Sequence, residues 1–296
     1  MKICVTSVML PRWTLDETFD RLAAAGYGGV ELRVRPFTGK PDDEPSFWGR
    51  HLTDVSPANV VQKAPAIRAA AARTGIAVAA LAPQVNAVDA PACESLFRGA
   101  VSIDPAKPPM VRVGVAGYDR AKPYLPQFDA ARKAFAGCVE RARPFGVKCI
   151  YEIHAGTLAM TATRARALLD GLDTALAGAI YDIPNMSRVG LEDTRQGMEA
   201  LGPYLAHCHI GGSRPVVKPG GPAVRDEWSW EFCDLRRGIA NIPAILDDFR
   251  HVGYQGWLSL EDFSPGDDET KIREQGAWLK SLSADALGAD APGAGS

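Results

Sequence analysis

The sequence has no excess of charge of either sign. Its 33 basic and 35 acidic residues leave a net charge of −2, and no basic run stands out. Binding to nucleic acid or to an anionic membrane surface therefore has no electrostatic support. Apolar runs are also short, and none approaches the roughly 20 residues that a membrane-spanning helix needs. We expect neither a nucleic-acid partner nor a membrane partner.

Cysteine is sparse for a disulfide scaffold. The chain has six cysteines and no Cys-x-x-Cys pair, which fits reduced thiols in a cytoplasmic protein. The N-terminal run MKICVTSVML is interrupted by Thr6 and Ser7 and lacks a small-residue cleavage site, so it predicts a first strand and not a signal peptide. No P-loop, Gly-x-Ser-x-Gly or His-Glu-x-x-His motif occurs, and no glycine-rich phosphate turn follows the first strand. This disfavours a doubly wound nucleotide-binding sheet.

The sequence does show a regular alternation of short Val- and Ile-rich runs with amphipathic stretches. The runs predict strands at 2–8, 28–34, 76–86, 110–117, 147–156, 178–185, 205–212 and 256–263. The amphipathic stretches predict helices at 14–26, 57–74, 91–102, 128–146, 161–172, 191–202, 242–253 and 268–282. Thr14 with Glu17 three residues later predicts a capping box at the first helix. Eight strand–helix units in about 280 residues predict an α/β fold, a (β/α)8 TIM barrel. We expect one domain over residues 1–283 and a disordered tail over 284–296.

In such a barrel the chemistry lies at the carboxyl ends of the strands. Side chains on a strand alternate between two faces, so the apolar residues reveal which face points inward. On the fifth predicted strand, Tyr151 and Ile153 suit the outer helices, which turns the residues between and after them toward the barrel axis. The same reading applies to the seventh and eighth strands. The inward-facing polar residues are then Glu152, His154, His207, His209 and Glu261.

Three carboxylates are expected around one opening, namely Glu152, Asp182 and Glu261. Burying like charges together is costly unless a cation compensates them. Arg33 or Arg214 would supply part of that charge, and a divalent cation with His209 as nitrogen ligand would supply it more compactly. A lone inward glutamate is often no more than an ion-pair partner, but four such residues from four consecutive strands favour a shared metal site.

Five stretches span nearly the whole chain and carry a family resemblance. They are AGYGGVELRV, YEIHAG, IYDIPNM, LGPYLAHCHIGG and RRGIANIPAILDDFRHVGYQGWLSLEDF. Together they resemble the xylose isomerase-like TIM-barrel superfamily of sugar isomerases and epimerases, which includes tagatose-3-epimerase-like proteins and endonuclease IV. The order Glu, Asp, His, Glu on the last four strands matches the single-metal site of that family. The resemblance implies a metal held by Glu152, Asp182, His209 and Glu261.

The resemblance also implies a divalent-metal-dependent sugar isomerase or epimerase. In similar epimerases two metal-bound glutamates flank the substrate, and here these are Glu152 and Glu261. One removes the proton next to a carbonyl and the other returns it, with an enediolate between the two steps. His209 lies nearer the strand end than His207, so we expect His209 to reach the metal and His207 to support it from the layer below. The oxygen-rich ligand set favours manganese, magnesium or cobalt, with zinc as a further candidate.

Substrate contacts are expected from polar or aromatic residues near the strand ends, which are Trp13, His154, Asn185 and Arg214. An imidazole can donate or accept a hydrogen bond to a sugar hydroxyl. Arg214 can hold an oxygen or an anionic group. Trp13 can stack on a sugar face, although packing in the core explains it equally well.

The sequence departs from the family in three places. A frequent His-x-Lys-Asp pattern is replaced by His209-Ile210-Gly211-Gly212, and Asp-x-x-His is replaced by Asp182-x-x-Asn185. The segment 211–230 is rich in glycine and proline and carries Trp228 and Trp230, which suits a lid that stacks on a sugar or an aromatic aglycone. These departures leave the metal ligands in place and the substrate open.

Three other functions compete with this prediction. A lyase acting by β-elimination on a 3-oxo-glycoside would share the metal and the proton abstraction, and relatives that cleave C-glycosides have similar YDxxNM and LGPYLAHxH stretches. A trinuclear zinc DNA-repair nuclease needs more than the five histidines present, and a basic face. A non-enzymatic metal- or sugar-binding barrel has no need of an acid–base pair. We expect a small sugar or glycoside as substrate, and a homo-oligomer or a partner subunit is compatible with the sequence.

Overall fold

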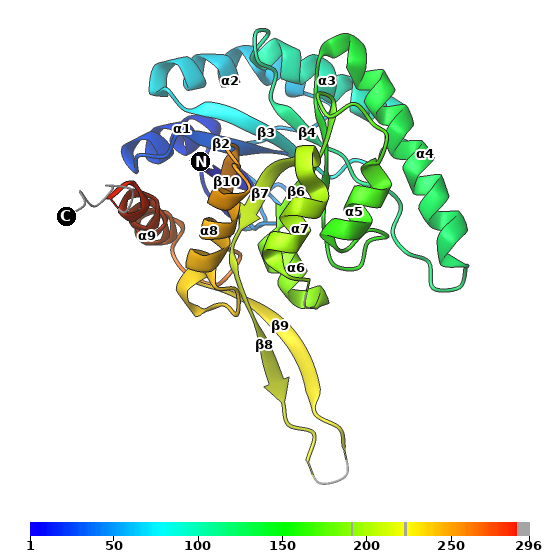
Figure 1. The fold of residues 1–296 in the computed structure, drawn as a ribbon. Coiled ribbons are helices and arrows are strands. Elements are labelled where there is room, and N and C mark those ends of the chain that lie inside the picture. The colour runs from blue at the N-terminus through cyan, green and yellow to red at the C-terminus, as the bar shows by residue number, and fades with distance from the viewer. Residues whose placement is uncertain (191, 222–223, 289–296) are drawn as a thin grey trace, which may run out of the picture.

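Eight parallel strands close into a barrel, and helices form a ring around it (Figure 1). The structure is a computed structural model that describes residues 1–190, 192–221 and 224–288. Around the barrel the strands follow the order β1-β10-β7-β6-β5-β4-β3-β2. The (β/α)8 barrel predicted from the sequence is confirmed.

The barrel strands are β1 (Lys2–Thr6), β2 (Gly29–Val34), β3 (Ala77–Pro83), β4 (Met110–Arg112), β5 (Cys149–Glu152), β6 (Ala177–Asp182), β7 (Leu205–Ile210) and β10 (Trp257–Leu260). The helices are α1 (Leu15–Ala24), α2 (Val60–Thr74), α3 (Ala90–Ile103), α4 (Tyr124–Ala142), α5 (Ala162–Leu169), α6 (Ile183–Val189), α7 (Thr194–Leu201), α8 (Ile242–His251) and α9 (Asp268–Gly288). Residues 289–296 of the expected tail lie outside the described residues. No helix within the described ranges is long and apolar enough to cross a membrane.

The core has two parts because barrel strands alternate between an inner and an outer face. A large apolar layer fills the space between the strands and the helices. Inside the barrel, Ala80, Ile150 and Ile180 form a small separate cluster. Tyr151 and Ile153 belong to the outer layer, as the alternation predicts. The barrel axis is therefore closed by aliphatic side chains, and polar side chains can gather at its carboxyl end.

The capping box predicted at α1 is present. The backbone N–H of Glu17 donates to Thr14 Oγ1 at 3.3 Å, and the backbone N–H of Thr14 donates to Glu17 Oε2 at 2.9 Å. Each bond satisfies a backbone donor that the first helical turn would otherwise leave without a partner.

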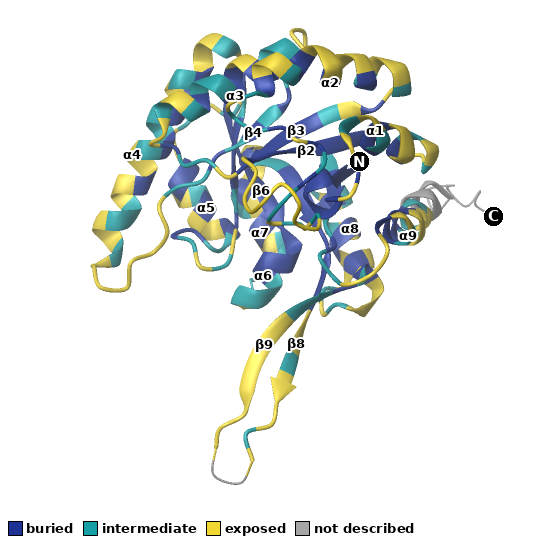
Figure 2. Cartoon of the chain, turned by 180° about the vertical axis from the view of Figure 1, so that it is seen from behind, coloured by how far each residue is buried: buried dark blue, intermediate teal, exposed yellow. Residues whose placement is uncertain are grey.

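The segment expected to be a lid over 211–230 is instead part of an antiparallel hairpin. It consists of β8 (Gly212–Lys218) and β9 (Glu227–Cys233) and extends away from the barrel (Figure 1). Most of its outer part is exposed (Figure 2), and Trp228 is 66% exposed. Its strands are rich in valine and aromatic residues, which favour β structure, whereas Gly220 and Gly221 lie in the connection between them.

A further difference lies after β6, where the sequence predicted a strand as far as residue 185. The strand ends at Asp182, and α6 begins at the next residue. Asp182 is the N-cap of this helix, because its Oδ1 accepts a hydrogen bond from the backbone N–H of Asn185 at 2.8 Å. The cap fixes the carboxylate of Asp182 at the mouth of the barrel.

Candidate metal centre and pocket

Four side chains expected to hold a metal come from four neighbouring strands. Glu152 and Asp182 are the last residues of β5 and β6, His209 lies on β7, and Glu261 directly follows β10. Asp182 is level with His209 across β6 and β7, and Ser259 of β10 is level with His209 on its other side. The closed barrel therefore brings these strand ends to one place.

The three carboxylates converge on one nitrogen atom. His209 Nδ1 lies 3.0 Å from Asp182 Oδ2, 3.1 Å from Glu152 Oε1 and 3.2 Å from Glu261 Oε2. A single N–H can point at one acceptor only, so a proton on Nδ1 cannot satisfy all three oxygens. Glu261 Oε2 is buried and has no hydrogen-bond partner among the described residues. Ligand atoms of Glu152, Asp182 and His209 lie close enough together to hold one metal ion, and Glu261 approaches the same nitrogen. Such a set of carboxylates and one imidazole nitrogen fits a divalent cation.

Glu31 on β2 connects the two histidines of β7. Its Oε2 lies 3.0 Å from Nε2 of both His207 and His209, and all three side chains are buried. Burial opposes ionisation of Glu31, but the two histidines outweigh it and hold its pKa well below the usual value. An ionised carboxylate only accepts hydrogen bonds, so both histidines donate through Nε2. In its neutral form His209 then has its lone pair on Nδ1, the atom that faces the three carboxylates, which is the orientation a metal ligand requires.

His207 reaches this centre through Glu31. It lies one layer deeper than His209 and is fully buried. Without a cation, the pKa of His209 is raised well above 6.5, because Glu31, Glu261 and the other carboxylates outweigh the effect of its burial. A proton on His209 then replaces part of the missing positive charge.

Arg112 on β4 was not singled out in the sequence, although it belongs to this site. Its Nη1 donates to Glu152 Oε2 at 2.8 Å, and its Nε and Nη2 donate to the carbonyl of Pro83. Despite burial, Arg112 and His209 hold the pKa of Glu152 below its usual value. Burial and the neighbouring carboxylates raise the pKa of Glu261. The two glutamates therefore differ in charge environment. Because Val111 and Val113 face the helices, strand alternation could have identified Arg112.

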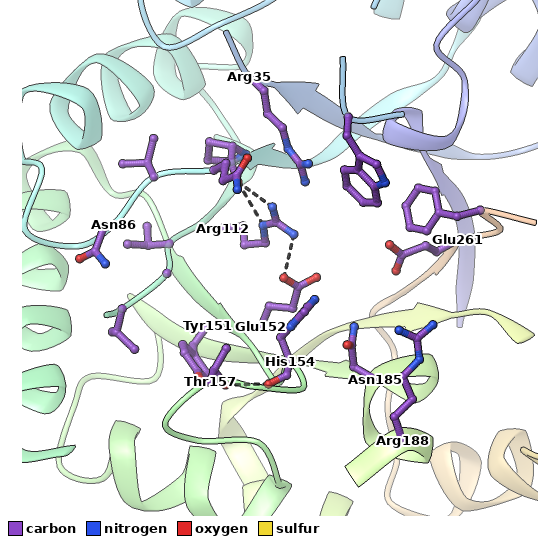
Figure 3. Close-up of a pocket in the computed structure, with 18 of the residues that line it drawn as sticks. Arg35, Asn86, Arg112, Tyr151, Glu152, His154, Thr157, Asn185, Arg188 and Glu261 are labelled. Carbon is purple, nitrogen blue, oxygen red and sulfur yellow. Dashed lines mark hydrogen bonds and ion pairs between the residues drawn. The ribbon is translucent and has the colours of Figure 1, made fainter. Parts of the chain in front are cut away.

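A pocket of about 520 Å³ opens above these groups (Figure 3). Glu152 and Glu261 both line it, with 15% and 12% of their side chains exposed. Its aromatic wall is formed by Trp48, Phe232 and Phe263, which lie on a loop, the base of the hairpin and the segment after β10. The ring centroid of Phe263 lies 4.9 Å from that of Trp48 and 5.1 Å from that of Phe232.

Two of the four residues expected to contact substrate line this pocket. They are His154 and Asn185. Asn185 also holds a metal-ligand candidate, because its Nδ2 donates to Asp182 Oδ2 at 2.9 Å. Trp13 and Arg214 are not brought to the pocket. Trp13 is buried in the outer core with the Arg21 guanidinium 5.0 Å from its ring, and Arg214 pairs with Glu231 on the exposed hairpin.

Gly211 directly follows β7, and the close approach of neighbouring atoms leaves no room there for a side chain. A Cβ atom on Gly211 would lie 2.3 Å from the carbonyl oxygen of Glu261 and 2.7 Å from Pro184 Cγ. The backbone N–H of Glu261 also donates to the carbonyl of Ile210 at 2.9 Å. Only glycine allows β7 and the segment after β10 to approach this closely, and that approach places Glu261 beside His209.

Comparison with known proteins identifies the family. The model of the xylose isomerase-like TIM barrel matches residues 19–282. The chain belongs to that family. A search of curated protein sequences gives no significant match. Among solved structures, 3-keto-D-glucoside 4-epimerase YcjR from E. coli is similar with a TM-score of 0.67 and 17% identity, over 95% of this chain and 99% of that one.

Two other similar structures contain metal ions. A xylose isomerase-like TIM barrel protein from Mycobacterium smegmatis, in complex with magnesium, has a TM-score of 0.65 and 15% identity over 96% of this chain and 97% of that one. The IOLI protein with a zinc atom has a TM-score of 0.68 and 17% identity over 97% of this chain and 98% of that one. At this identity the similarity establishes the shared fold.

Proposed function

We propose that the protein is a divalent-metal-dependent sugar isomerase or epimerase that acts by proton abstraction next to a carbonyl. The observation that carries the proposal is the pair Glu152 and Glu261. Both line the pocket, and one oxygen of each lies within 3.2 Å of the same nitrogen of His209. Two carboxylates in such different electrostatic environments suit a proton acceptor and a proton donor.

The residues of this chain divide the chemistry between them. Glu152, kept ionised by Arg112, removes the proton next to the substrate carbonyl. Glu261, whose pKa is raised, returns a proton from the other side. Glu152, Asp182, His209 and Glu261 would hold the cation, and manganese, magnesium or cobalt suits so many oxygen donors. A divalent cation held there would supply the positive charge that stabilises an enediolate.

A lyase is the second candidate, and the aromatic wall favours it. Trp48, Phe232 and Phe263 present three rings to the pocket, which is more apolar surface than a small sugar requires. A glycoside with an aromatic aglycone would cover these rings, and the same proton abstraction next to an oxo group would expel the aglycone. The similar YcjR structure is that of an enzyme named for a keto-glucoside.

Solvent deuterium exchange tests the proposal. The manganese-loaded protein is incubated in D2O with ketoses, aldoses and 3-oxo-glycosides, and proton NMR follows the signals. We expect metal-dependent exchange, loss of exchange in EDTA, and a 10²- to 10⁴-fold slower rate in Glu152→Gln, roughly the contribution of a general base. Glu140→Gln, an exposed glutamate on α4 paired with Arg143, is the matched control and should exchange at the wild-type rate.

The products separate the candidates. A new epimer or isomer supports the isomerase, and release of an aglycone supports the lyase. Absence of exchange with every substrate, in protein that binds the metal, would contradict both.

A further inference from the structure

The charge balance around the pocket changes once a metal is present. Four carboxylates lie in or directly below the pocket, Glu31, Glu152, Asp182 and Glu261. Four arginines lie in or beside it, Arg33, Arg35, Arg112 and Arg188. The eight charges cancel in sum, but among the described residues only Arg112 pairs with one of these carboxylates. A divalent cation that neutralises the carboxylates therefore leaves the other arginines at the pocket without a counterion. Excess charge in such a site is costly unless a ligand neutralises it.

Among these four arginines, Arg188 on α6 has the fewest acceptors for its charge and its N–H groups. It lines the pocket, and within the described ranges it forms no hydrogen bond and no ion pair. Its Nε and Nη2 atoms are buried and have no partner. These two donors form the side-on edge of the guanidinium, which binds both oxygens of a carboxylate or phosphate. A buried donor without an acceptor destabilises the protein. A ligand that brings acceptor oxygens to these two atoms would remove that cost.

Cation–π contacts with aromatic rings restrain two of these guanidinium groups. The Arg188 guanidinium carbon lies 4.2 Å from the ring centroid of Phe232. Arg35 repeats the arrangement, with its guanidinium carbon 5.4 Å from the Trp48 ring and one hydrogen bond, from Nε to the Ala82 carbonyl at 3.4 Å, among the described residues. Figure 3 shows Arg35 and Arg188 extending into the pocket from opposite sides, with Glu152 and Glu261 between them. Stacked arginines lose little further freedom when they bind an anion.

We propose that Arg188 is the anchor of an anion subsite, with Arg35 adding positive charge across the pocket, and that the substrate is a sugar bearing a carboxylate or a phosphate. This inference deepens the proposed function and rests on it for the choice of sugar ligands. The anionic group binds the Nε–Nη2 edge of Arg188, while the sugar carbons lie between Glu152 and Glu261.

Calorimetric titration of the manganese-loaded protein tests the subsite with three probes: glucose, glucuronate and glucose 6-phosphate. We expect at least one anionic probe to bind about tenfold or more tightly than glucose. Arg188→Gln should weaken that probe by roughly 10- to 100-fold and leave glucose unchanged. Arg188→Lys should restore part of the loss, because lysine keeps the charge but not the two-donor edge. Arg68→Gln, an exposed arginine on α2, is the matched control and should bind as the wild type does.

The outcomes are distinct. Preference for glucuronate identifies a carboxylate, and preference for glucose 6-phosphate identifies a phosphate. Equal binding of all probes, failure of both anionic probes to bind, or equal losses for glucose and the anionic probe in Arg188→Gln would each overturn the subsite. An affinity that EDTA abolishes but Arg188→Gln leaves intact would place the anion on the metal and would also overturn it. Anion preference without deuterium exchange supports the subsite and counts against the isomerase, whereas exchange of a neutral ketose without anion preference does the reverse.

Discussion

Glu31→Gln tests whether one buried carboxylate controls which nitrogen of His209 faces the metal. His209 Nε2 lies 3.2 Å from Glu31 Oε1 and 3.0 Å from Oε2. Whichever way a glutamine amide is turned, its NH2 group therefore lies beside Nε2. An amide oxygen also lies beside Nε2, but it is neutral, and the NH2 group next to it can donate to an Nε2 that carries no proton. The variant therefore holds the proton on Nε2 less firmly than the glutamate does and shifts His209 toward the form with its proton on Nδ1. That proton occupies the position directed at Glu152, Asp182 and Glu261.

The expected magnitude follows from the role of groups that orient metal ligands. Loss of such a partner lowers metal affinity by about 10- to 100-fold, which corresponds to about 1.4 to 2.8 kcal/mol. Titration calorimetry with manganese measures the affinity, and circular dichroism verifies that the barrel remains folded. Asp248→Asn is the matched control, because Asp248 is a largely buried carboxylate that binds Thr194 and Arg195 on the outside of the barrel. It should retain wild-type affinity for manganese.

An unchanged manganese affinity in folded Glu31→Gln protein would refute the reasoning. It would mean that the carboxylates alone fix the proton of His209 and that Glu31 serves only to fill the barrel.

Three further predictions concern stability. In EDTA, the raised pKa of His209 contributes to the stability of the fold, and the contribution is complete at pH values below the unfolded-state pKa of about 6.5. It is lost as the pH rises through the pKa of His209 in the folded state, so the melting temperature in EDTA should fall toward alkaline pH. A flat or rising profile would contradict this. Thr14→Ala removes the bond from Glu17 to the cap side chain and should cost about 1 kcal/mol in urea denaturation, so an unchanged midpoint would count against the capping box. Gly211→Ala forces a methyl group against the Glu261 carbonyl and should cost about 2 kcal/mol or more, whereas a wild-type melting temperature would show that the two segments can separate freely.

Strand alternation was sufficient to predict much of the site. In a closed parallel barrel, neighbouring strand ends meet at one rim, so the inward residues Glu152, His209 and Glu261 had to approach one another. The same rule places Glu31 and Arg112 inward on β2 and β4. The contacts of Glu31 and Arg112 with the centre were not predicted, because the metal-site pattern in the sequence lies on the last four strands alone.

The positions of the other expected site residues depend on segments outside the barrel strands, where side chains do not alternate regularly between two faces. After β7 the chain enters β8, which pairs with β9 in the hairpin. Arg214 lies on β8 and is therefore on the exposed hairpin, away from the pocket. Trp13 follows β1, but the short helical turn after that strand buries its ring in the outer core. Asn185 lies within α6 because Asp182 caps a helix there. Such outcomes depend on contacts between distant segments, and alternation within one strand does not contain that information.

The hairpin contributes to the wall of the pocket but not to the candidate cation site. Phe232 at its base belongs to the pocket wall, yet none of the four residues assigned to the cation lies on β8 or β9. Mutations in the hairpin can thus reshape one side of the pocket while the four candidate cation ligands remain unchanged. The hairpin is in this sense a separate part of the pocket, and its sequence can vary independently of the barrel rim that carries the candidate cation ligands.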